Sequence, residues 1–230
     1  MGKSKKTNVK MESTTEELSS DQLLEIFTQT AKYHQRPIVV ITMGIPGSGK
    51  STVVKKIIEK NLNKIIPSSA KYKFSDFVNC NPDEFLPYIK DDDQKTRLAK
   101  ASRKNAAILK KIREAPEKYS VIYDGTGANL SAYKGNINKF IQHGYFTILI
   151  YVKTNPLVAK NRVKRRTRKV KSEDIQRIFE DLDEPIKGLK QIKKFDFYKE
   201  MVLGNEGVYI VVNNTFRSKI IETNISGLSM

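Results

Sequence analysis

The sequence has few of the side chains from which disulfides and metal centres are built. Its 230 residues include one cysteine, Cys80, two histidines and no tryptophan. A single cysteine excludes an internal disulfide and is typical of a reducing compartment, so a cytoplasmic protein is expected. His34 and His143 lie too far apart along the chain for a zinc motif. No apolar run reaches membrane-spanning length, and the N-terminus lacks the apolar core of a signal peptide.

Acidic residues are also scarce beside basic ones. The chain carries 42 lysines and arginines against 25 acids, a formal net charge of +17. Residues 95–113 contain eight basic side chains and no acid, and residues 153–171 contain nine and none. Such stretches favour a polyanionic ligand, either nucleotide phosphates or nucleic acid. The alternative for the first stretch is a solvated lysine-rich surface.

The most specific motif is "GIPGSGKST", which starts at Gly44 and fits the phosphate-loop pattern G-x-x-x-x-G-K-[ST]. Glycines let backbone N–H groups curl around phosphates, Lys50 can reach the β- and γ-phosphates, and the Ser51 hydroxyl can bind Mg²⁺. The preceding "PIVVITM" is typical of a buried strand and the following "STVVKKIIEKNL" of an amphipathic helix. A plain glycine-rich turn is the alternative. The residues expected to hold the nucleotide are Gly44, Pro46, Gly47, Ser48, Gly49, Lys50, Ser51 and Thr52.

Strands and helices alternate along the rest of the chain. Strands are expected at 37–43, near 77–80, in "YSVIYD", "YFTILIYV" and "GVYIVVNN", with helices at 18–33, 50–62, 94–113, 130–142 and after Pro156. This order predicts an α/β P-loop NTPase fold with a parallel sheet of about five strands and helices on both faces. Residues 1–16 are expected to form a disordered basic tail, 17–216 the domain, and 217–230 a C-terminal tail. Ligands of such sheets bind at the carboxyl ends of the strands.

Two carboxylates fall at those carboxyl ends. Asp124 follows "VIY", the arrangement of a Walker B aspartate that holds Mg²⁺, although an aspartate before Gly125 can also simply form a turn. Asp83 in "NPDEF" is placed to accept a proton from an attacking hydroxyl, with Glu84 as the substitute base. The alternative role of Asp83 is to cap a short helix. Thr126, in the turn after Asp124, is expected at the substrate.

Four arginines lie within seven residues of the second basic stretch: Arg162, Arg165, Arg166 and Arg168. Helical spacing of three and four places the first three along one side. So dense a group of guanidiniums repels itself unless a polyanion is near. These side chains are therefore expected to bind the phosphates of ATP and to neutralise charge on the transferring group.

Taken together, these motifs resemble one family. "GIPGSGKST", "NPDEFLP", "VIYDGTGANLSAY" and "QHGYFTILIYVKTNPLVAKNRVKRR" follow in the order and spacing of zeta-toxin-like kinases, which are related to polynucleotide kinases. The resemblance covers roughly residues 36–214. It implies that Lys50 and Ser51 bind ATP and Mg²⁺, that Asp83 is the base, and that Asp124, Gly125 and Thr126 lie at the metal and substrate. Zeta toxins phosphorylate a sugar hydroxyl of UDP-N-acetylglucosamine.

The sequence departs from this family at two places. The arginines are spaced more closely than in the family, and the acidic substrate contact of the family corresponds to Asn105-Ala106 within a basic segment. This second departure favours a more anionic acceptor. The expected activity is therefore ATP- and Mg²⁺-dependent phosphorylation of a hydroxyl, with Lys50, Asp83, Arg162 and Arg166 as catalytic groups. The acceptor is a nucleotide-sugar or a nucleic acid 5′-hydroxyl, and a nucleic-acid-binding NTPase is the alternative class.

Overall fold

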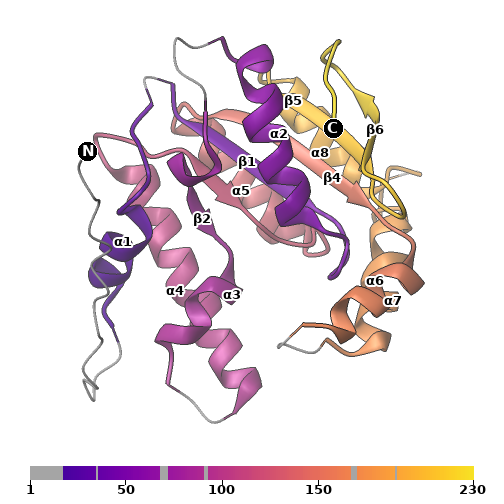
Figure 1. The fold of residues 1–230 in the computed structure, drawn as a ribbon, viewed down its shortest axis with the longest axis horizontal. Helices are drawn as coiled ribbons and strands as arrows, with labels where there is room; N and C mark the ends of the chain where they lie inside the picture. Colours follow the sequence, from indigo (N-terminus) through magenta and orange to yellow (C-terminus); the bar gives the residue numbers. More distant parts are fainter. Residues whose placement is uncertain (1–17, 35, 68–71, 91–92, 167–169, 190) are drawn as a thin grey trace, which may run out of the picture.

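A six-stranded sheet forms the centre of the computed structural model (Figure 1). The structure describes residues 18–34, 36–67, 72–90, 93–166, 170–189 and 191–230. The strands are β1 (Ile38–Met43), β2 (Val78–Cys80), β3 (Val121–Tyr123), β4 (Phe146–Lys153), β5 (Val208–Asn213) and β6 (Lys219–Thr223). Their order is β2-β3-β1-β4-β5-β6, and every neighbouring pair is parallel except β5 and β6. The expected α/β class with a mostly parallel sheet is confirmed.

A helix precedes β1, and further helices connect the parallel strands. They are α1 (Ser20–Thr28), α2 (Lys50–Ile65), α3 (Pro82–Phe85), α4 (Gln94–Glu114), α5 (Leu130–Gln142), α6 (Pro156–Lys164), α7 (Ser172–Asp183) and α8 (Lys194–Leu203). The cap of α1 is Ser19, whose side chain accepts from the Gln22 N–H. In the ranges that the structure describes, no helix is both long and apolar enough to cross a membrane.

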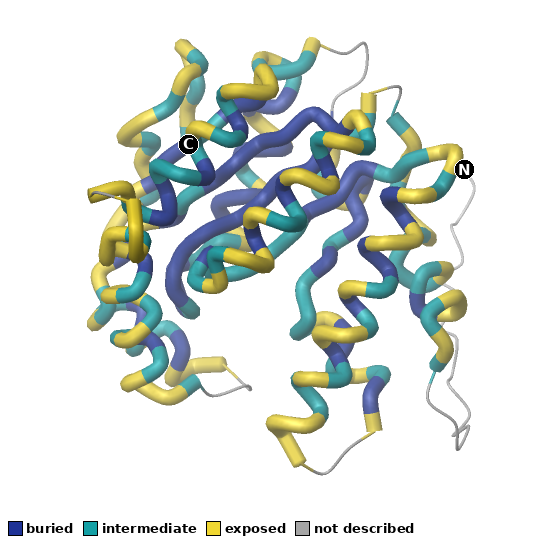
Figure 2. The backbone as a smooth tube through the Cα atoms, turned by 180° about the vertical axis from the view of Figure 1, so that it is seen from behind, coloured by how far each residue is buried: buried dark blue, intermediate teal, exposed yellow. Residues whose placement is uncertain are grey.

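The sheet separates two hydrophobic cores because alternate side chains of each strand point to opposite faces. Along β1, Ile38 and Val40 pack with the apolar side of α2, whereas Val39 and Ile41 pack with α4, α5 and α8. In Figure 1 helix α2 lies in front of the sheet, and in Figure 2 the buried strands pass between helices whose outer surfaces are exposed. This layering brings the ends of β1, β3, β4 and β5 to one edge, where the predicted ligand site lies.

The C-terminal segment is part of this domain, so the boundary drawn at residue 217 needs correction. Strand β6 pairs with β5, and Ile220 packs on the core beneath α2, as do residues further along the segment. The Asn61 amide donates to the Ser229 carbonyl at 2.6 Å and its oxygen accepts from the Ser229 N–H at 2.9 Å. An edge strand with exposed side chains gives little periodic signal, which explains why it was not predicted.

Removing residues 218–230 should therefore destabilise the domain. The truncation strips partly buried apolar side chains from the α2-side core and leaves the buried Asn61 amide without its partners. We expect the free energy of unfolding to fall by about 2 kcal/mol or more. Chemical denaturation measures this free energy of unfolding. Ile221→Ala is the control, because Ile221 is half exposed on β6 and its replacement should change stability little. An unchanged midpoint for the truncated protein would show that the segment is a tail.

Candidate functional site

The phosphate-loop residues lie between the end of β1 and the start of α2, as expected. Gly47 and Gly49 have φ of +83° and +86°, in the left-handed region that favours glycine. A Cβ at Gly47 would strike the Ala159 carbonyl and come within 2.8 Å of the Val163 side chain of α6. A Cβ at Gly49 would strike the Asn214 amide. Glycine at both positions is thus required by packing within the protein as well as by the backbone conformation.

We expect Gly47→Ala to disturb both stability and nucleotide binding. The left-handed conformation costs an alanine about 1–2 kcal/mol, and the clash with Ala159 adds to this by pushing α6 from the loop. Gly135→Ala is the matched control, because a Cβ inside α5 meets nothing within 4 Å. That control should stabilise by about 0.5–1 kcal/mol. Thermal unfolding of the Gly47→Ala and Gly135→Ala proteins, with and without ATP, measures both effects. Equal unfolding temperatures of the two variants would contradict the packing role of Gly47.

The Ser48 carbonyl ties the loop to three other segments. It accepts from the Asn214 amide at 2.6 Å, the Thr154 hydroxyl at 3.1 Å and the Arg162 guanidinium at 3.4 Å. Ser48 is fully buried. These bonds fix the peptide that joins Ser48 to Gly49 and so orient the N–H groups that follow. The sequence placed Asn214 at a strand end without a role, because its partner lies 166 residues away.

Lys50 starts α2 and turns back over the loop. Its ammonium donates to the Gly44 carbonyl at 2.9 Å and to the Ile45 carbonyl at 3.4 Å. Burial lowers the pKa of Lys50, while the carboxylate of Asp124 opposes this effect. A desolvated cation inside a ring of carbonyl and N–H groups is suited to a polyphosphate, which would supply the missing negative charge.

A cavity of about 560 Å³ opens beside the loop. Helices α3 and α4 supply one wall and the segment around α7 the other, and in Figure 1 these two groups lie on either side of the lower part of the molecule. Ten of the predicted site residues line it: Pro46, Gly47, Gly49, Lys50, Ser51, Asp83, Asp124, Gly125, Thr126 and Arg166. The six other predicted site residues that the structure describes do not line it: Gly44, Ser48, Thr52, Glu84, Arg162 and Arg165.

Asp124 directly follows β3 and is held by polar groups from the strands on either side of β3. One carboxylate oxygen accepts from the Thr42 hydroxyl of β1, and the other accepts from the Asn81 amide at 2.8 Å. The Thr42 hydroxyl in turn accepts from the Gly125 N–H at 3.1 Å. Each carboxylate oxygen keeps a further lone pair, so the group can still bind a metal. A threonine inside the apolar strand "IVVITM" was the sequence signal for this contact, and it was missed.

Ser51 and Asp124 also face a common space. Both line a small cavity of about 10 Å³, together with Thr42 and Asn79. A hydroxyl and a carboxylate oxygen are ligands that Mg²⁺ accepts, with phosphate oxygens and waters completing its shell. The chemistry of the side chains present therefore fits Mg²⁺. Among the described residues no cluster of three or more acids, histidines or cysteines suggests a second metal centre.

Asp83 lies in the first turn of α3, and Asn81 caps this helix. The Asn81 side chain accepts from the Asp83 N–H at 2.9 Å and caps the helix, so the capping role does not fall to the Asp83 carboxylate. Asp83 lines the same cavity as Lys50. Glu84 is exposed and lies 3.5 Å from the Asn79 amide. Of the two acids, Asp83 is the one that lines the cavity.

The turn after Asp124 braces the loop. The Thr126 carbonyl accepts from the Gly44 N–H at 2.9 Å. A Cβ on Gly125 would strike the Tyr133 hydroxyl, which donates to the Thr42 carbonyl at 3.0 Å. Glycine in this turn is therefore required by packing against α5.

The arginines separate into different environments. Arg162 reaches the loop, donating to the Ser48 and Thr215 carbonyls, and Arg166 lines the cavity. Arg165 is exposed at the end of α6, and Arg168 lies outside the described residues. Helix α6 ends at Lys164, so the expected single helical row of three arginines is wrong.

Four of the eight basic residues of α4 contact other parts of the fold. Arg97 donates to the Leu86 carbonyl at 2.7 Å and Lys104 to the Leu18 carbonyl at 2.6 Å. Lys111 pairs with Asp21 at 2.6 Å. Buried Arg113 lies over the Phe140 ring of α5 and donates to the side-chain oxygen of Asn136 at 3.3 Å. The cavity wall that α4 supplies consists of Leu98 and Ser102 instead.

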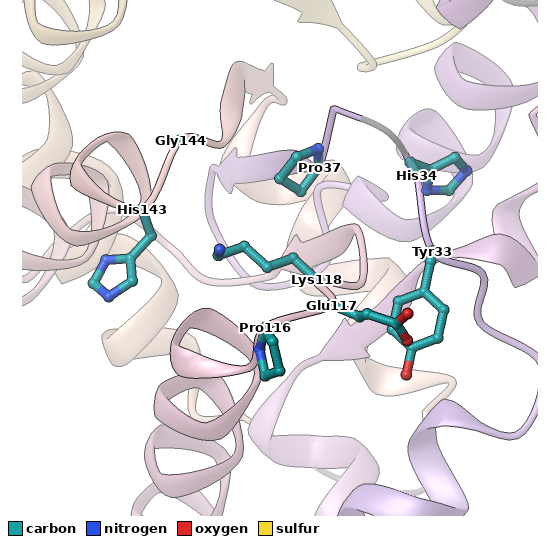
Figure 3. Close-up of a pocket in the computed structure, with 8 residues that line it drawn as sticks. All are labelled: Tyr33, His34, Pro37, Pro116, Glu117, Lys118, His143 and Gly144. Carbon is teal, nitrogen blue, oxygen red and sulfur yellow. The ribbon is translucent and has the colours of Figure 1, made fainter.

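Another cavity, of about 330 Å³, lies at the opposite edge of the sheet (Figure 3). Its lining includes His34, His143, Lys118 and Glu117. The His34 Nδ1 and the Ser120 hydroxyl form a hydrogen bond at 2.8 Å, and that hydroxyl also accepts from the Ile38 N–H at 3.0 Å. The histidine thereby joins the starts of β1 and β3. The phosphate loop lies at the other edge, so this cavity is not the nucleotide site.

Comparison with known proteins agrees with this geometry. The zeta toxin family model matches residues 21–215. A structure from the PezAT chromosomal toxin-antitoxin system of Streptococcus pneumoniae is similar, with 14% identity, a TM-score of 0.62 and coverage of 89% of this chain and 78% of that one. The AvrRxo1-ORF1:AvrRxo1-ORF2 structures with sulphate ions and with ATP have TM-scores of 0.67 and 0.65. Each is 12% identical to this chain, and each match covers 92% of this chain and 68% of the other. No curated protein sequence matches significantly. Because the family model spans most of the chain, this protein belongs to the zeta toxin family.

Proposed function

We propose that this protein is a kinase that transfers the γ-phosphoryl group of ATP to a hydroxyl acceptor. The observation that carries the proposal is the meeting of Lys50, Asp83 and Asp124 in one cavity beside the phosphate loop. A similar structure was determined with ATP, which supports ATP as the donor. The Ser51 hydroxyl and the Asp124 carboxylate would hold Mg²⁺, which when bound neutralises charge on the phosphates.

In the proposed reaction the acceptor oxygen forms a bond to the γ-phosphorus while the bond to the β,γ-bridging oxygen breaks. ADP leaves with that electron pair. Asp83 accepts the proton of the acceptor hydroxyl, and the ammonium of Lys50 and the guanidinium of Arg166 stabilise negative charge on the transferring group. Arg162 acts through the Ser48 carbonyl by holding the loop.

The proposal is tested by transfer from γ-labelled ATP in the presence of Mg²⁺. UDP-N-acetylglucosamine and a 5′-hydroxyl oligonucleotide are offered in parallel as acceptors, because the family suggests the first and the net charge of +17 the second. Label on an acceptor, lost with Asp83→Ala, supports a kinase. Oligonucleotide binding and ATP hydrolysis without a labelled acceptor would favour the alternative, a nucleic-acid-binding NTPase.

A further inference from the structure

We propose that two buried tyrosines, Tyr133 of α5 and Tyr198 of α8, position the turn that carries Asp124 and thereby set how tightly the site holds Mg²⁺. The turn runs from Asp124 to Gly127. This inference rests on the proposed function, because it concerns the same Mg²⁺ position at Ser51 and Asp124. Neither tyrosine lines the cavity, so both would be positioning residues that act through the turn.

Each tyrosine hydroxyl donates to a backbone carbonyl in the turn or beside it. Tyr198 donates to the Gly127 carbonyl at 2.9 Å, and Tyr133 donates to the Thr42 carbonyl at 3.0 Å. Both side chains are buried, and their burial raises the pKa of each hydroxyl above its usual range, so both stay protonated donors at neutral pH. Because a buried carbonyl without a donor is unfavourable, these two bonds hold the backbone in place.

Thr42 links the Tyr133 hydroxyl to the Asp124 carboxylate. The Thr42 hydroxyl donates to Asp124 and accepts from the Gly125 N–H at 3.1 Å. The carbonyl of Thr42 is thus fixed by the tyrosine, while its hydroxyl fixes the proposed metal ligand. A carboxylate held in this way needs little rearrangement to bind a cation. The loss of such outer partners typically weakens metal binding by about 10- to 100-fold.

The turn also packs directly on the tyrosines. A Cβ on Gly125 would strike the Tyr133 hydroxyl. The rings of Tyr133 and Tyr198 lie with their centroids 5.5 Å apart, inside the hydrophobic core on the α5 and α8 side of the sheet. A close-packed support of this kind leaves the turn little freedom to move. The two hydroxyls therefore help to determine where the Asp124 carboxylate lies.

Removing each hydroxyl while keeping its ring tests the inference. Mn²⁺ is used in place of Mg²⁺, because its paramagnetic resonance signal reports binding to the protein–ATP complex directly. Tyr133→Phe and Tyr198→Phe should each raise the Mn²⁺ dissociation constant by about tenfold, while ATP binding in the presence of EDTA stays the same. Tyr145→Phe is the matched control, because its buried hydroxyl donates to the Ile112 carbonyl at 3.4 Å, just before the start of β4 at the opposite edge of the sheet.

The outcomes separate this inference from the proposed function. If Mn²⁺ binding changed no more in Tyr133→Phe and Tyr198→Phe than in Tyr145→Phe, the hydroxyls would serve stability alone and the inference would be overturned. If the unchanged protein bound neither ATP nor Mn²⁺, the proposed function would fail and the inference with it. Chemical denaturation shows whether each variant is folded. Tyr198→Phe removes a bond to a different carbonyl, so it decides the matter even if Tyr133→Phe is unstable.

A double-mutant cycle tests the contact from the side of the turn. Gly125 does not have a positive φ, so Gly125→Ala acts through its clash with the Tyr133 hydroxyl. Without that hydroxyl the nearest atom is the ring carbon Cζ at 3.0 Å, and a small shift of the ring accommodates the methyl group. Gly125→Ala should weaken Mn²⁺ binding by at least about fivefold in the unchanged protein and by at most about twofold in Tyr133→Phe. An equal effect in both backgrounds would contradict the inference.

Discussion

The Asp83→Asn protein is expected to bind ATP normally and to transfer its phosphoryl group at least about 100-fold more slowly. The substitution keeps the shape of the side chain and removes the group that would accept the hydroxyl proton, a contribution of about 10²- to 10⁴-fold. Asp83 lines the cavity while Asn81 performs the helix capping, so the fold should tolerate the change. Initial rates of transfer and equilibrium ATP binding measure the two properties separately.

Glu84→Gln decides between the two acids of this turn. Glu84 is exposed and outside the cavity lining, so its amide variant should keep the transfer rate. If the Asp83→Asn protein kept full activity and the Glu84→Gln protein were slow, Glu84 and not Asp83 would be the general base. Full activity of both would remove general-base catalysis from α3 altogether.

Lys50→Met is expected to weaken ATP binding and to slow transfer by about 100- to 1,000-fold, the usual loss when one preorganised charge is removed from such a site. The ammonium is desolvated among the Gly44 and Ile45 carbonyls, and its burial lowers its pKa. Replacing it with an apolar chain removes this desolvation penalty. The free energy of unfolding without nucleotide should therefore stay the same or rise.

Lys55→Met is the matched control for this charge, because Lys55 is exposed on the same helix. Calorimetric titration with ATP and chemical denaturation of both variants give the comparison. If both variants bound ATP as tightly as the unchanged protein, the loop would not be the nucleotide site. A destabilised Lys50→Met protein would instead assign the ammonium a structural role.

The elements with strong local signals were predictable. β1 and β4 are continuous apolar strands, and α5 ends at Gln142, as the sequence indicated, with His143 as its C-cap and Gly144 at a positive φ. Helix α8 was predictable too but was missed, since Phe195, Tyr198 and Val202 are spaced as on one helical face and are buried. Strand β6 was not predictable, because its side chains are mostly exposed and its pairing depends on β5.

The candidate site shows the same division between local and tertiary information. The loop motif located Lys50 and Ser51 because it is contiguous. Thr42, Asn81 and Asn214, which orient Asp124 and the Ser48 carbonyl, come from three separate strand ends. The threonine inside the apolar strand β1 was a signal for Thr42, but nothing adjacent in the sequence marks Asn81 or Asn214.

Charge was the most misleading signal. The eight basic residues of residues 95–113 indicated a polyanion, yet a count of charges does not show which of them have partners in the fold. Arg97 and Lys104 end on backbone carbonyls, and Arg113 is buried against an aromatic ring. The charge of a cavity wall depends on which side chains reach it, and this required the structure.

The fate of the γ-phosphoryl group tests the central claim most directly. The protein would be incubated with Mg²⁺, ATP that carries ¹⁸O on its γ-phosphate, and a dephosphorylated metabolite extract, and labelled products would be identified by mass spectrometry. The account predicts ¹⁸O-phosphate on a hydroxyl compound, formed in step with ADP and lost with Asp83→Asn. Label confined to inorganic phosphate, or ATP left intact while the extract is unchanged, would contradict it.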